Sequence, residues 1–210
     1  MRINESSRVI GSRPGVIIGV AGACAVLGAL SLVTQQIWSI VAGSVIEVDT
    51  PILGTTLYAA EIALFAVAVV GLCRYQRHAF GRFGRVAARV AITGTVLWSI
   101  SAAWQAVQVI RAGGQPEEDY TSAALLAWII VPFGLYALGL ILFGIATWRA
   151  RVLPRVAAAL VVFGIPLGMA FDGLALTVYG TGLAWLGVAA LVQRPAGRAV
   201  RGARPAALAS

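Results

Sequence analysis

The stretch that decides the fold covers residues 52–89 and reads ILGTTLYAAEIALFAVAVVGLC, followed by RYQRHAFGRFGRVAAR. Its first part, residues 52–73, is apolar except for a single charged residue, Glu61. One helix needs about 20 predominantly apolar residues to cross a lipid bilayer. The second part, residues 74–89, holds five arginines. The stretch therefore predicts a transmembrane helix followed by a basic loop on one side of the membrane.

The composition of the whole chain supports this prediction. Of its 210 residues, 60% are hydrophobic and only 11% are charged, and the mean hydropathy is +0.88. A soluble domain carries roughly 25% charged residues. Disordered chains are polar and highly charged. The composition therefore excludes both classes and predicts an integral membrane protein.

Further apolar segments extend the pattern to six transmembrane helices. Residues 16–40, 86–110 and 123–148 each have the length of one helix, whereas residues 154–192 are too many for one. Phe171-Asp172-Gly173 marks a tight turn that divides this last region into two short helices. One of them could be partly re-entrant, which leaves a count of five spans as the alternative. The sequence thus predicts an all-α fold, a six-helix transmembrane bundle over residues 16–192.

The arginines indicate how the bundle is oriented. All 16 basic residues are arginines, and 15 of them fall before the first helix, after the second, after the fourth or after the sixth. Only Arg111 falls on the other side, where most acidic residues gather. Arginine-rich loops stay in the cytoplasm. We therefore expect both termini to be cytoplasmic in the cell membrane, with residues 1–15 as an N-terminal arm and residues 193–210 as a disordered tail.

Four polar residues are candidates for a binding site: Glu61, Gln105, Gln108 and Asp172. Glu61 lies about nine residues into the second predicted helix, near the middle of the bilayer, where a carboxylate usually faces the bundle interior or a water-filled cavity. Gln105 and Gln108 share one face of the third helix. Asp172 lies in the turn between the last two helices, so polar groups concentrate toward the outer side.

Two interpretations of these residues stay open. Glu61 is either a proton- or cation-linked site or a neutral carboxylic acid that ties two helices together. In both cases its carboxyl should point into the bundle, within hydrogen-bond reach of a polar group on the first or third helix. The glutamines either line a vestibule that opens to the exterior or make ordinary hydrogen bonds between helices.

The motifs of common enzymes and cofactor sites are missing from the sequence. There is no H-E-x-x-H, no G-x-S-x-G and no lysine for a phosphate-binding loop. His78 is the only histidine, and Cys24 and Cys73 are the only cysteines. We therefore expect no enzyme activity, no metal and no other cofactor. The net charge of +8 is explained by topology, so we expect no nucleic-acid partner.

The turn after the fourth predicted helix, residues 148–155, reads WRARVLPR. A helix that ends in Trp148-Arg149, followed by Leu153-Pro154-Arg155 and a helix of Ala, Leu and Val, resembles a turn in uncharacterised multi-pass membrane proteins of actinobacteria. The likeness covers this turn and the following helix. It implies a membrane location and no particular chemistry.

Transport of a small solute or an ion, with Glu61 as the intramembrane carboxylate, is the function that these observations favour. The alternative is a non-catalytic subunit or scaffold of a larger membrane complex, which includes a substrate-capturing subunit. The expected partners are the lipid bilayer and either another membrane protein or further copies of this chain.

Overall fold

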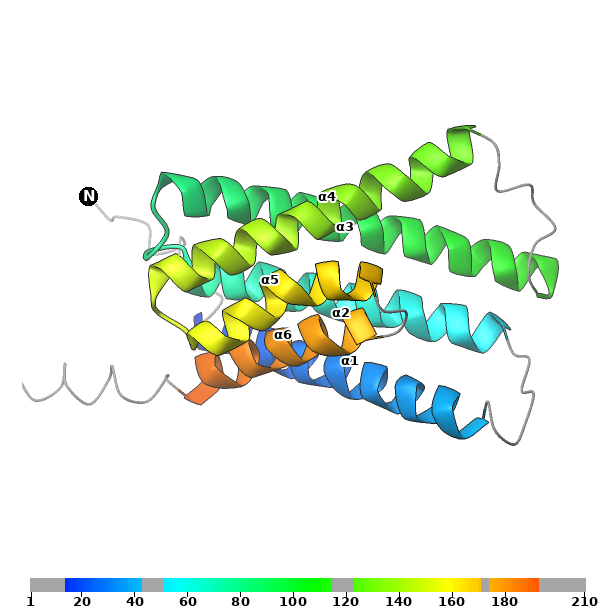
Figure 1. The fold of residues 1–210 in the computed structure, drawn as a ribbon, viewed down its shortest axis with the longest axis horizontal. Helices are drawn as coiled ribbons and strands as arrows, with labels where there is room; N and C mark the ends of the chain where they lie inside the picture. Colours follow the sequence, from blue (N-terminus) through cyan, green and yellow to red (C-terminus); the bar gives the residue numbers. More distant parts are fainter. Residues whose placement is uncertain (1–13, 43–50, 115–122, 171–173, 193–210) are drawn as a thin grey trace, which may run out of the picture.

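The structure, a computed structural model, describes residues 14–42, 51–114, 123–170 and 174–192. This part of the chain is all-α, as predicted, and forms six helices (Figure 1). The helices are α1 (Pro14–Ala42), α2 (Pro51–Gln76), α3 (Arg82–Ala112), α4 (Ala123–Ala150), α5 (Arg155–Ala170) and α6 (Leu174–Val192). The predicted N-terminal arm, the predicted C-terminal tail and Asp172 lie outside the described residues.

Three of the helices are long and apolar enough to cross a membrane. They are α2, α3 and α4, over Ile52–Gln76, Arg82–Ala112 and Ala127–Ala150. The described parts of α1, α5 and α6 contain shorter apolar helices. Helix α5 ends at Ala170 and α6 begins at Leu174, on either side of the predicted break. The predicted positions of the helices are therefore confirmed.

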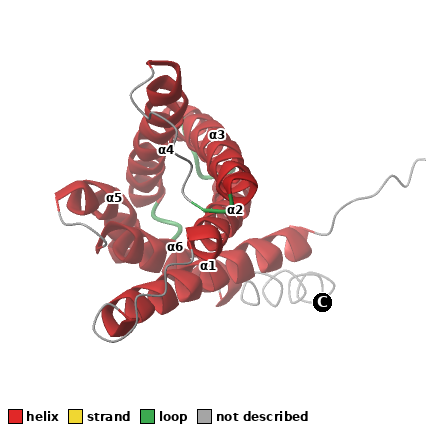
Figure 2. Ribbon diagram, turned by 90° about the vertical axis from the view of Figure 1, so that its right-hand side faces the viewer, coloured by secondary structure: helices red, strands yellow, loops and turns green. Residues whose placement is uncertain are grey.

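The six helices form a closed ring in which each packs against the next along the chain. Contacts between α1 and α6 close the ring, and α2 also touches α6 across it. Figure 2 views the bundle from one end, with α1 crossing the view at a slant. Helix α2 thus contacts three other helices, so side chains on its inner face lie at the centre of the bundle.

Small residues let the helices approach closely. A Cβ added to Gly71 of α2 would collide with the Cβ of Ala21 on α1. A Cβ on Gly164 of α5 would lie 2.6 Å from the backbone nitrogen of Tyr179 on α6. These close approaches fix the spacing of α1 to α2 and of α5 to α6.

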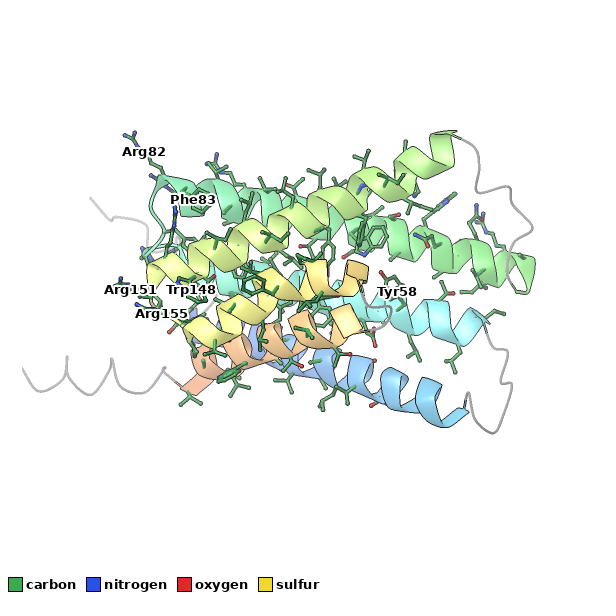
Figure 3. All side chains as sticks on the ribbon, in the orientation of Figure 1. Tyr58, Arg82, Phe83, Trp148, Arg151 and Arg155 are labelled. Carbon is green, nitrogen blue, oxygen red and sulfur yellow. The ribbon has the colours of Figure 1, made fainter. Side chains whose placement is uncertain are left out.

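The hairpin of α5 and α6 is shorter than the rest of the bundle. Helix α5 has 16 residues and α3 has 31, which correspond to about 24 Å and about 46 Å of helix. In Figure 1 the hairpin ends about halfway along α2 and α3. Its other end lies with Arg82, Arg151 and Arg155 (Figure 3), which we call the arginine-bearing end. The opposite half of the ring is built from α1 to α4.

Candidate functional site

Glu61 lies inside the ring, on the inner face of α2. Its side chain is only 1% exposed. The hydroxyl of Ser31 on α1 lies within hydrogen-bonding reach of its carboxyl group. The expectation that the carboxyl points into the bundle and reaches a polar group on the first or third helix is therefore confirmed. The polar group is the hydroxyl of Ser31 on α1, whereas the amide of Gln105 on α3 lies against another side chain, as described below.

Aromatic side chains from four helices surround this level of the bundle. We call them the aromatic cluster: Tyr58 and Phe65 of α2, Trp98 of α3, Phe133 and Tyr136 of α4, and Tyr179 of α6. The Trp98 Nε1–H donates a hydrogen bond of 3.2 Å to the Tyr58 hydroxyl. Tyr58 is labelled in Figure 3, on α2 near the level where the α5–α6 hairpin ends.

The rings of the cluster form a continuous chain across the interior. The ring centroids of Trp98 and Tyr136 are 6.4 Å apart, and those of Tyr136 and Tyr179 are 6.2 Å apart in an edge-on arrangement. Phe65 completes the chain at 5.5 Å from Tyr179. Aromatic pairs at these distances stabilise one another. The cluster therefore holds α2, α3, α4 and α6 together at the level of Glu61.

Two tyrosine hydroxyls of the cluster are buried without a well-formed hydrogen bond. Tyr136 and Tyr179 are 3% and 2% exposed. Their hydroxyls approach each other. Neither has a partner of good geometry within the described part of the chain. Leaving a buried polar group unsatisfied costs about 1–3 kcal/mol. Such a group in a native fold needs an explanation, and a functional role is one of the few available.

Glu61 and the tyrosines form one polar group within an apolar interior. Glu61 lies close enough to Tyr58 and Tyr179 for its charge to act on both hydroxyls. Tyr58 and Glu61 are three residues apart on α2, so they share one face of the helix. The site thus offers a carboxylate, three phenolic hydroxyls and the Ser31 hydroxyl, all oxygen groups that can hold a proton or a small cation.

The predicted glutamines lie on the same face of α3, nearer to the end opposite the arginines. Gln105 and Gln108 are half-buried. The amide of Gln105 is 3.5 Å from the Ser101 hydroxyl, and that hydroxyl donates to the Trp128 carbonyl oxygen over 3.3 Å. Ser101, Gln105 and Gln108 form a polar row on α3 that begins one turn beyond Trp98. The structure therefore brings Glu61 next to the aromatic cluster and places the glutamines on the approach to it, whereas Asp172 is not described.

On the other side of Glu61 the interior is filled with apolar side chains. Leu72 of α2, Leu140 and Phe143 of α4, and Leu183 of α6 are all at most 1% exposed. Gln76 and Thr147 lie beyond this layer, at the arginine-bearing end, and are buried with side-chain polar atoms that have no partner among the described residues. Glu61 is therefore separated from that end by a closed apolar layer.

Sequence reasoning missed Ser31 and the three tyrosines of the site. Tyrosines of membrane helices usually lie at the two membrane surfaces, where the hydroxyl stays hydrated. Tyr136 and Tyr179 instead lie about 14 residues from the arginine-bearing ends of α4 and α6, hence about 20 Å from that end of the bundle. A tyrosine in the middle of an apolar segment was the signal that could have found them.

Neither a candidate metal site among the described residues nor a match to a known protein accompanies this polar site. No group of three His, Cys, Asp or Glu side chains suited to a metal occurs in the described ranges. No protein-family model matches the chain, and neither a curated protein nor a solved structure does.

Proposed function

We propose that the chain is a six-span protein of the cell membrane that transports a small cation, in the simplest case a proton, through a site at Glu61. The observation that carries this proposal is the burial of a carboxyl group next to the aromatic cluster, in which two tyrosine hydroxyls lack a well-formed partner. A carboxyl group inside a membrane bundle is costly, and such groups usually mark ion paths and proton relays.

The chemistry of the site suits a cation. A tyrosine hydroxyl both donates and accepts a hydrogen bond, so it can pass a proton on or offer an oxygen to a metal cation. Ser31, Tyr58 and Tyr179 adjoin Glu61 from three helices. A proton or cation bound to Glu61 would therefore have oxygen groups on several sides. We propose no enzyme activity, because the sequence holds none of the common catalytic motifs.

Access to the site comes from the end opposite the arginines. The row of Ser101, Gln105 and Gln108 on α3 leads from that end toward Trp98. The short α5–α6 hairpin does not extend into this half of the bundle (Figure 1). The apolar layer around Leu72 and Leu140 closes the other side. Transport therefore requires a second conformation in which this layer opens.

The orientation that we propose has both termini in the cytoplasm. Arg82, Arg151 and Arg155 lie together at one end of the bundle (Figure 3), whereas Arg111 belongs to the last turn of α3 at the other. The exposed Trp148 at the arginine-bearing end suits a membrane interface. In this orientation the polar row on α3 opens to the exterior, and α5 and α6 enter from the cytoplasmic side.

Flux measurements in liposomes test the proposal. The purified full-length chain is reconstituted into vesicles that contain a pH-sensitive dye, and a potassium diffusion potential drives protons inward. Parallel vesicles take up radioactive sodium. We expect faster flux of one of these cations than in empty vesicles, and we expect Glu61→Gln to reduce it to the background rate, because the amide keeps the volume but cannot ionise.

Thr95→Val is the matched control for this experiment. Thr95 is as buried as Glu61, and its hydroxyl bonds to the Ala91 carbonyl oxygen of its own helix. Its replacement should leave the flux unchanged. Background flux of both cations in the wild type, or full flux in Glu61→Gln, would refute the transport proposal. A stoichiometric partner that co-purifies from native membranes in mild detergent would then favour the role of a subunit or scaffold.

A further inference from the structure

A second polar site lies at the arginine-bearing end, far from Glu61. A partly open cavity of about 250 Å³ separates the start of α3 from the last turns of α4. Residues 79–84 form one wall, and Ala146, Arg149 and Ala150 form the other. Because a water molecule occupies about 30 Å³ of liquid, the cavity has room for a phosphate group and several waters.

The first wall carries unsatisfied backbone donors. Gly81 is the N-cap of α3, and no side chain caps the helix there. The first amides of a helix, here those of Arg82, Phe83 and Gly84, have no acceptor inside it. All three residues line the cavity. Helix α3 is 31 residues long, so its aligned peptide dipoles add a partial positive charge at this end.

Two arginines line the cavity. Arg82 belongs to the first turn of α3 and Arg149 to the last turn of α4. The guanidinium carbon of Arg149 lies 5.2 Å from the centroid of the Phe83 ring, a cation–π contact between the two walls. The only carboxylate in the described ranges is that of Glu61, inside the ring. Within these ranges the positive charge of the cavity is therefore not neutralised.

We propose that this cavity binds a phosphate group. Arginine pairs with phosphate through two parallel hydrogen bonds, and helix N-termini bind phosphate through their free amides. The cavity combines both kinds of donor from two helices. The phosphate belongs either to the headgroup of an anionic lipid, because Trp148 places this end at a membrane surface, or to a small soluble phosphate compound. The shared ligand is an anionic phosphate group that bridges α3 and α4.

Binding is measured on the full-length chain in two arms at constant ionic strength. In the first arm, inorganic phosphate is added to the protein in neutral detergent. In the second, the protein is placed in phosphatidylcholine nanodiscs with or without phosphatidic acid. Each arm records the melting temperature and the apparent affinity. Stabilisation in the first arm identifies a soluble phosphate as sufficient, and stabilisation only in the second identifies the lipid headgroup.

Two variants remove the site in different ways. The double variant Arg82→Gln/Arg149→Gln should weaken binding by about tenfold or more, because each lost charged hydrogen bond is worth about one decade or more in affinity. Gly81→Asp places a carboxylate where the phosphate would bind. A Cβ at Gly81 meets nothing within 4 Å, and aspartate is a preferred N-cap, so this variant should fold at least as stably as the wild type while losing binding.

Arg155→Gln is the control, since it removes the same charge at the same end but lies outside the cavity. It should bind phosphate like the wild type. The proposal is overturned if neither arm stabilises the wild type. It is also overturned if Gly81→Asp retains binding, or if Arg155→Gln loses as much affinity as the double variant, because the effect would then be one of overall charge.

Discussion

Replacing Gly94 with alanine tests how closely α3 and α4 pack at the level of the aromatic cluster. A Cβ on Gly94 would lie 2.5 Å from the backbone carbonyl carbon of Leu135 and 2.6 Å from the backbone nitrogen of Tyr136. Ordinary contacts begin at 3.4 Å. Because both neighbours are backbone atoms of another helix, no side-chain rotation can relieve the collision. Helix α4 must instead move away by about 1 Å.

The loss of folding free energy in Gly94→Ala follows from this displacement of α4. Overpacking a tight core costs about 1–3 kcal/mol, and a gap of 0.5–1 Å forfeits a quarter to a half of each contact's attraction. Since α3 and α4 share the largest interface in the bundle, we expect Gly94→Ala to lower the free energy of unfolding by about 3 kcal/mol. The measurement is unfolding in mixed micelles with increasing sodium dodecyl sulfate, followed by tryptophan fluorescence.

Gly134→Ala on α4 is the matched control. A Cβ at Gly134 meets nothing within 4 Å. The added methyl group would project away from α3, so this variant should unfold like the wild type. If Gly94→Ala is as stable as Gly134→Ala, α3 and α4 do not approach as described, and the position of Tyr136 in the aromatic cluster would be wrong as well.

Two further predictions concern the orientation and the buried hydroxyls. For the orientation, Cys24 and Cys73 are first replaced by alanine, and single cysteines are then placed at Gly81 or at Gly114, where a Cβ meets nothing within 4 Å. The two cysteines should label from opposite sides of intact cells. Equal reaction of both with an impermeant reagent added outside would contradict the proposed orientation. Tyr136→Phe and Tyr179→Phe should leave the melting temperature unchanged or raise it, since each removes a hydroxyl without a well-formed partner. Both variants should slow cation flux in liposomes. A marked drop in melting temperature would instead identify the hydroxyls as structural ties.

Much of the fold could be predicted from local sequence signals. Residues 52–73 are predominantly apolar for the length of a bilayer, and α2 covers them with one residue more before and three after. Phe171-Asp172-Gly173 separates two apolar segments. Helix α5 ends just before it, and α6 begins just after it. Glu61 points inward because its carboxyl is costly to expose to lipid. Each of these predictions depends on the properties of one segment.

The composition of the site could not be predicted in the same way. The approach of Ser31 to Glu61 depends on how α1 is rotated against α2. The spacing of apolar residues does not determine this rotation, because nearly every position of the two helices is apolar. The contact of Tyr136 with Tyr179 joins α4 to α6, far apart in the chain. Gln105 was a plausible partner for Glu61, but its amide lies against Ser101 of its own helix. The resemblance of residues 148–155 to actinobacterial membrane proteins stays a prediction.

The most direct test of the central claim is whether the Glu61 carboxyl exchanges its proton with the surrounding solution. A lipid-soluble carbodiimide adds to a protonated carboxyl group, and peptide mapping by mass spectrometry identifies the modified residue. For the full-length chain in liposomes, we predict an adduct at Glu61 whose rate of formation falls as the pH is raised or as sodium is added. An adduct that forms at the same rate under all these conditions, or none at any pH, would contradict the account.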